Sequence, residues 1–109
     1  FFNLFEDDQV KVKELIIEPK KGMSLQKHHK RSEIWLVSHG KCLVNYSKVS
    51  ADEIEEITLD KHNSLHVELG DWHQITNPFN EICKIIEIQY GKETIEEDIE
   101  RHSYYRNDE

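Results

Sequence analysis

The chain has 109 residues, a mass of 13.0 kDa and a formal net charge of −8 at pH 7, which suits a single domain spanning residues 1–109. Its 33% charged and 37% hydrophobic residues exclude a disordered chain, and no apolar run approaches the ~20 residues of a membrane span. The negative charge disfavours nucleic acid, and the apolar residues 1–5 are too few for a signal peptide, so we expect a cytoplasmic protein with no nucleic-acid or membrane partner.

Short runs of β-branched and aromatic residues recur along the chain, and clusters of turn-forming residues separate them. This spacing is typical of an all-β barrel or sandwich. Gly40 favours a tight hairpin turn, and the polar stretch between Tyr46 and Glu53 predicts a longer surface loop. The expected strands are 10–18, 23–29, 33–37, 41–46, 54–59, 64–69, 73–76 and 82–90.

The pattern changes after Gly91. Thr94, followed three residues later by Glu97, forms a capping-box signature, and Ile95 and Ile99 fall on one face of a helix. We therefore expect a short C-terminal helix that packs across the mouth of the barrel or onto a neighbouring chain.

Polar residues dominate one face of the expected strand 23–29 and its continuation. Alternate side chains of a strand share a face, so Gln26, His28 and Lys30 should point one way, and Lys27 and His29 the other. If the first face lines a barrel, three polar side chains lie where uncompensated burial is costly. Such burial is typical of a functional site.

Two spaced motifs resemble those of the cupin family. The first comprises Gly22, His28, Glu33 and Gly40. The second comprises Gly70, His73 and Asn77. Together they are far more specific than either alone. The resemblance implies a single cupin domain, which is a double-stranded β-helix or jelly-roll barrel.

The resemblance also implies a metal site. Cupins use two histidines and a glutamate of the first motif and one histidine of the second to bind a divalent ion. His28, Glu33 and His73 match three of these four positions. Two histidines and one carboxylate still form a known metal-binding set, so one divalent metal (Zn, Mn, Fe or Ni) is expected.

Lys30 stands at the fourth position and weakens the expected metal site, because a protonated amine repels a cation. One alternative is that Gln26 or His29 completes the shell. The other is an ion pair between Lys30 and Glu33, which would leave a metal-free pocket.

Nearly the whole chain resembles the cupin domain of type II mannose-6-phosphate isomerases, a module that often follows a mannose-1-phosphate guanylyltransferase domain. The chain departs from that family at Ile34, where the family has His, and at Glu68, where it has Pro. The matching segments are 12–19, 24–26, 28–29, 31–33, 35, 77–78, 85–91 and 97–101.

This resemblance implies an isomerase that interconverts an aldose phosphate and a ketose phosphate in sugar-nucleotide or polysaccharide precursor metabolism. The reaction needs a proton-transferring group and an electrophile that stabilises the enediolate, and Glu33 and Lys30 are the candidate catalytic residues. Gln26, Arg31 and Arg101 are the candidate substrate-binding residues, since a guanidinium binds phosphate with two parallel hydrogen bonds.

Two other functional classes fit the sequence. Lys30 favours a non-catalytic, metal-free cupin that binds a small sugar or acid, or that regulates a transferase on a separate chain. A metal-dependent dioxygenase is the third class, and oxygen consumption with bound iron would identify it. In each case we expect a homodimer, because a second copy can cover an exposed edge strand or an apolar sheet face.

Overall fold

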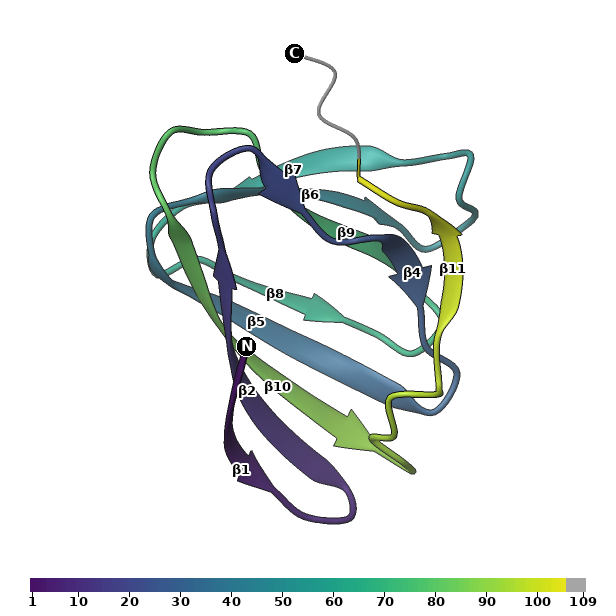
Figure 1. Cartoon of the computed structure of the whole chain (residues 1–109). Helices are drawn as coiled ribbons and strands as arrows, with labels where there is room; N and C mark the ends of the chain where they lie inside the picture. Colours follow the sequence, from purple (N-terminus) through teal and green to yellow (C-terminus); the bar gives the residue numbers. More distant parts are fainter. Residues whose placement is uncertain (106–109) are drawn as a thin grey trace.

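The computed structural model describes residues 1–105, in which eleven strands form two antiparallel sheets that face each other (Figure 1). The first sheet has the order β1 (Phe2–Glu6), β2 (Val10–Ile17), β10 (Cys83–Gly91), β5 (Arg31–His39) and β8 (Ser64–Val67). The second has the order β11 (Glu100–Ser103), β4 (Leu25–Lys27), β9 (Trp72–Asn77), β6 (Cys42–Ser47) and β7 (Glu55–Leu59), with β3 (Lys21–Gly22) paired to β9.

Buried and more exposed residues alternate along the strands that form the barrel wall. In β2, β5 and β10 every second side chain is buried, as expected for strands with one face on a core. The register aligns these inward positions across the first sheet: Leu15 is opposite Ile85, and Ile85 is opposite Val37. These residues and their neighbours form the apolar core. It comprises Leu15, Ile17, Trp35, Val37, Cys42, Val44, Tyr46, Leu59, Val67, Ile75, Cys83 and Ile85.

The predicted all-β fold is confirmed, but the predicted C-terminal helix is wrong. Residues 92–99 run as an irregular segment, which we call the strap, and lead into β11. β11 pairs with β4 and extends the second sheet (Figure 1). Residues 1–105 contain no helix with the length and hydropathy that a bilayer crossing requires.

Tertiary contacts explain why the strap is not helical. The carbonyl of Thr94 accepts a hydrogen bond from Lys11 Nζ at 3.0 Å, and the Asp98 carboxylate accepts from the backbone amides of His29 and Lys30 at 2.9 and 2.8 Å. A helix of so few residues is only marginally stable, so these contacts outweigh the local capping signal. The sequence pattern also missed β1, whose five residues are all exposed.

Candidate functional site

A cavity of ≈ 210 Å³ lies at the polar end of the barrel interior. Its charged and amide side chains include Lys13, Gln26, Arg31, Glu33, Glu87 and Arg101. The cavity therefore brings together every residue predicted to bind substrate. A larger hollow of ≈ 840 Å³ follows β5 and β9, but exposed loop side chains such as Lys41 and Glu81 line much of it. The buried polar groups make the smaller cavity the candidate site.

Glu33 is the centre of the polar network. Its side chain is buried, and it accepts hydrogen bonds from Arg31 Nε and Trp35 Nε1, both at 3.0 Å. Burial by itself would raise the pKa of Glu33, but the contacts with His28, His73 and Arg31 outweigh it and hold the pKa well below its usual range. Glu33 is therefore a carboxylate at any pH near neutral.

His28 and His73 flank this carboxylate, and each is oriented by a backbone carbonyl. His28 Nδ1 donates to the carbonyl of Asp98, and His73 Nδ1 donates to that of Asp71 at 2.9 Å. In this orientation each ring turns its Nε2 toward Glu33, at 3.2 Å for His28 and 3.8 Å for His73. Burial lowers the pKa of His73 and keeps its ring neutral.

The chemistry of these three residues fits a divalent cation. The candidate ligand atoms of His28, Glu33 and His73 all lie within 4.8 Å of one another. His73 Nε2 is buried and has no hydrogen-bond partner among the described residues, so its lone pair is free to bind an ion. Carbonyl acceptors on the opposite ring nitrogens are the usual support of metal-bound histidine.

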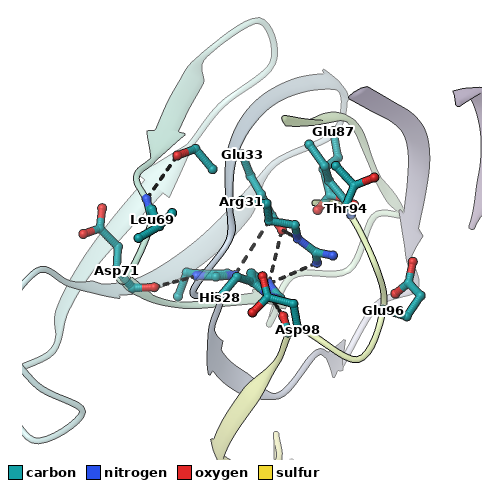
Figure 2. A network of polar contacts seen from close by, with 12 residues as sticks. His28, Arg31, Glu33, Leu69, Asp71, Glu87, Thr94, Glu96 and Asp98 are labelled. Atoms are coloured by element: carbon teal, nitrogen blue, oxygen red, sulfur yellow. Dashed lines mark hydrogen bonds and ion pairs between the residues drawn. The ribbon is translucent and has the colours of Figure 1, made fainter. Parts of the chain in front are cut away.

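Arg31 occupies the space between two of these groups. Figure 2 shows His28, Arg31 and Glu33 pointing toward one another. Arg31 Nη2 lies 3.1 Å from His28 Nε2, while its Nε binds Glu33. The guanidinium is buried and permanently charged, so it already neutralises Glu33. A metal ion bound here would therefore compete with Arg31 for the same carboxylate and imidazole.

The predicted ion pair between Lys30 and Glu33 is wrong. β4 ends at Lys27 and residues 29–30 form a bend, so the strand alternation does not continue to Lys30. Its side chain is 46% exposed and its Nζ lies 3.1 Å from Glu93 Oε2. Lys30 thus lies outside the cavity, and the neighbouring Arg31 is the cation that pairs with Glu33.

Glu87 and Gln89 belong to the site, although the sequence motifs did not include them. Both are buried on β10, and Gln89 Nε2 donates to Glu87 Oε1 at 2.6 Å. Burial and the nearby charge of Glu33 raise the pKa of Glu87 to about 8. Their signal was alternation, because they share the inward face of the expected strand 82–90 with Cys83 and Ile85.

Lys11 and Lys13 are two further residues that sequence reasoning missed. They share the inward face of β2 with the core residues Leu15 and Ile17, and only 7% of Lys11 and 4% of Lys13 is exposed. Their ammonium groups approach the strap, where Glu96 Oε1 lies 3.4 Å from Lys11 and 2.7 Å from Lys13.

The strap closes one side of the cavity with polar contacts. Arg31 Nη1 donates to the carbonyl of Ile95 at 3.4 Å, and the backbone amides of Lys92 and Glu93 reach the carbonyl of Lys30 at 3.0 and 3.5 Å. At the end of the strap Arg101 enters β11, where it is paired in register with Gln26. The site is therefore built from both sheets and the strap.

Comparisons with known proteins agree on family and fold. At 32% identity over 101 residues, the chain is similar to mannose-1-phosphate guanylyltransferase 2 of Escherichia coli O157:H7, covering 93% of this chain and 20% of that protein. It is 34% identical over 90 residues to the alginate biosynthesis protein AlgA of Pseudomonas putida strain KT2440, covering 83% and 17%. The chain thus spans about a fifth of the length of these curated relatives.

The fold resembles that of solved structures with little sequence identity. An uncharacterized conserved protein with a double-stranded β-helix domain from Klebsiella pneumoniae subsp. pneumoniae superposes with a TM-score of 0.76 at 12% identity, covering 93% of this chain and 81% of that one. The model of the family described as "Mannose-6-phosphate isomerase C-terminal" matches residues 2–104. The chain belongs to this mannose-6-phosphate isomerase C-terminal family.

Proposed function

We propose that this chain interconverts an aldose phosphate and a ketose phosphate, with mannose 6-phosphate and fructose 6-phosphate as the pair to test. One observation carries the proposal: in a member of this family, a single cavity holds a buried guanidinium beside a carboxylate, together with a second carboxyl of raised pKa. These groups are Arg31, Glu33 and Glu87. They match the two requirements of the reaction, an electrophile and a proton carrier.

Glu87 is the proposed proton carrier. With a pKa of about 8, its carboxylate is a stronger base than an ordinary glutamate and exists in useful amount near neutral pH. It takes the proton from the carbon next to the substrate carbonyl and returns it to the neighbouring carbon. Gln89, which donates to Glu87 Oε1, fixes the orientation of the carboxyl group.

Arg31 is the proposed electrophile, the role that the sequence suggested for Lys30. Proton removal leaves an enediolate, and a guanidinium stabilises its negative charge without losing a proton itself. Glu33 holds the guanidinium in place through Nε, and the Arg31 Nη atoms extend toward His28 and the strap. Glu33 thus acts by positioning, because its own low pKa makes it a weak base.

His28, Glu33 and His73 would hold a divalent metal ion such as Zn, Mn, Fe or Ni. A bound ion would supply Lewis-acid polarisation of the substrate oxygens. The two imidazoles would provide two nitrogen ligands and Glu33 one oxygen. Because Arg31 contacts two of these ligands, ion binding requires its side chain to turn away from them.

The test is conversion of mannose 6-phosphate to fructose 6-phosphate by the purified chain, with added divalent ions and separately with chelator. We expect turnover in the wild type and a loss of at least about 100-fold in Glu87→Gln, a typical contribution of a proton-transferring group. Glu97→Gln on the exposed strap is the matched control and should retain turnover. Absence of turnover under both conditions would contradict the proposal.

A non-catalytic sugar-binding or acid-binding cupin is the second candidate function. The contact of Arg31 with both Glu33 and His28 favours it, because a buried guanidinium neutralises the site without a metal ion. Under this alternative the chain binds mannose 6-phosphate at equilibrium and leaves it unchanged, with or without metal. Calorimetry and the conversion assay on one sample distinguish the two functions.

The biological setting is also a proposal. The relatives of this chain include an alginate biosynthesis protein and a mannose-1-phosphate guanylyltransferase. We propose that the chain serves sugar-nucleotide or polysaccharide precursor metabolism in the cytoplasm as a homodimer. Association with a guanylyltransferase domain is tested by co-purification.

A further inference from the structure

Two buried lysines of β2 have no role in the proton transfer proposed above. Lys11 and Lys13 point into the barrel, and both are more than nine-tenths buried. A lysine is almost never buried without a charged partner, because desolvation of an ammonium group is costly. Two such residues on one strand require an anion beside them.

The anion present is a carboxylate of the strap. Glu96 Oε1 lies 2.7 Å from Lys13 Nζ and 3.4 Å from Lys11 Nζ, so one oxygen faces both ammonium groups. The Glu96 side chain is 60% exposed. The Glu6 side chain is 55% exposed, and its Oε2 lies 3.6 Å from Lys11 Nζ. Exposed carboxylates neutralise buried ammonium groups only weakly, because water screens the attraction.

The other carboxyl groups of the cavity are already engaged. Glu33 binds Arg31, and Glu87 accepts a hydrogen bond from Gln89. Among the carboxyl groups that line the cavity, Glu96 is therefore the one that serves the lysines. Outside the cavity lining, Glu6 lies near Lys11, the carbonyl of Thr94 accepts a hydrogen bond from Lys11, and the ring of Phe1 lies beside Lys13.

The position of Glu96 on the strap allows another anion to displace its carboxylate from the two lysines. Its side chain lies on the exposed middle of the strap, whereas the contacts that hold the strap there are made by the backbone of Thr94 and Ile95 and by the carboxylate of Asp98. We propose that Lys11 and Lys13 form a subsite for the phosphate group of the ligand, in which the Glu96 carboxylate stands until the phosphate displaces it. This assignment rests on the proposed sugar-phosphate function.

The chemistry and the register both favour a phosphate. A phosphate brings up to two negative charges and three acceptor oxygens, which suits two ammonium groups better than one shared carboxylate oxygen. Lys13 is opposite Glu87 across the sheet, and Lys11 is opposite Gln89. Lys13 and Glu87 both line the cavity, so a phosphate held by the lysines would bring the attached sugar beside the proposed proton carrier.

The experiment measures inorganic phosphate, mannose 6-phosphate and mannose binding by calorimetry on the full chain. We expect Glu96→Gln to tighten phosphate and mannose 6-phosphate binding about threefold to tenfold, because the internal competitor loses its charge. Lys13→Met should weaken both about tenfold or more and leave mannose unaffected. Glu97→Gln, which removes the same charge from the next residue of the strap, should change neither affinity.

Two results would overturn the subsite. One is equal tightening by Glu96→Gln and Glu97→Gln, which would assign the effect to net charge alone. The other is an unchanged phosphate affinity in both Glu96→Gln and Lys13→Met. Glu96→Gln keeps the size and shape of an exposed side chain, and thermal unfolding with and without phosphate checks that the variant is folded, so this arm remains decisive if Lys13→Met is unstable.

Turnover of the same samples separates this inference from the proposed function. Phosphate binding that follows the expected order without isomerase turnover supports the subsite and contradicts the isomerase. Turnover with equal phosphate affinity in all variants supports the isomerase and contradicts the subsite.

Discussion

The two ends of the barrel interior differ in chemistry although the same three strands build both. At one end the aligned inward residues of β2, β10 and β5 are Leu15, Ile85 and Val37. At the other end they are Lys11, Gln89 and Glu33, only four residues away along β2. Burial of apolar side chains stabilises the fold, whereas burial of charged ones is costly unless they are paired. Burial at the apolar end therefore offsets the cost of burying charged side chains at the polar end.

The largest effect is expected from breaking the apolar end. Ile85 is fully buried in the middle of its row, so Ile85→Ala should lower the free energy of unfolding by about 3–4 kcal/mol through lost burial and a cavity. Urea unfolding followed by circular dichroism measures the change. Val49→Ala, at a residue 73% exposed, is the control and should change it by less than about 0.5 kcal/mol. Equal effects of the two would contradict the assigned core.

Breaking the polar end at Arg31 should destabilise the protein and open the metal site. Arg31→Met leaves the Glu33 carboxylate buried without its guanidinium, a loss of about 3 kcal/mol. It also removes the cation beside His28, so Zn²⁺ affinity should rise on the order of tenfold, which corresponds to ~1.4 kcal/mol.

Zinc titration with thermal unfolding as the readout tests this, since an ion that binds only the folded state raises its stability. Lys30→Met is the matched control, because Lys30 is half exposed and pairs with Glu93. If Arg31→Met leaves zinc affinity unchanged, the competition between guanidinium and metal ion does not exist.

The sequence predicted the apolar end better than the polar end. Alternation alone located the core strands, and motif spacing pointed to His28, Glu33 and His73, which the structure brings within 4.8 Å. Their role as metal ligands stays a prediction. Spacing failed at Lys30, because a bend after β4 shifts the inward direction to Arg31.

The prediction of a C-terminal helix failed for a related reason. The capping-box signature at Thr94 reflects local preference, whereas the strap conformation depends on contacts with Lys11 and His28, more than sixty-five residues away in the chain. Such contacts are absent from any local window of the sequence. By contrast, Glu87 and Lys13 were recoverable, because each shares the inward face of an expected strand with two apolar core residues.

A smaller effect is expected from the titration of Glu87. The folded protein binds a proton at Glu87 up to a pKa of about 8, whereas the ordinary value is 4.5, so its contribution to stability is complete below pH 4.5 and is lost as pH rises through about 8. Glu87→Gln should flatten this decline in the melting temperature. Wild-type turnover should rise over the same range, since the proposed base is active when deprotonated. The assignment would be contradicted if the melting temperature of the wild type rose relative to that of Glu87→Gln between pH 5 and 8.

The smallest effect on stability and on ligand binding is expected from substitutions on the outward face of the first sheet, which lies outside both ends of the barrel interior. The outward positions of the first sheet include Ile34, Leu36, Ile86 and Ile88, and Leu36 is 40% exposed. Because an apolar sheet face is normally covered, this face should join two copies in the predicted homodimer. Light scattering after size exclusion should give a dimer at micromolar concentration for the wild type and a monomer for Leu36→Glu. Val49→Glu, at an exposed residue in the loop after β6, is the control and should remain dimeric. A strictly monomeric wild type would contradict the predicted dimer. Since the outward face does not line the cavity, the monomeric Leu36→Glu variant should keep the phosphate affinity of the wild type.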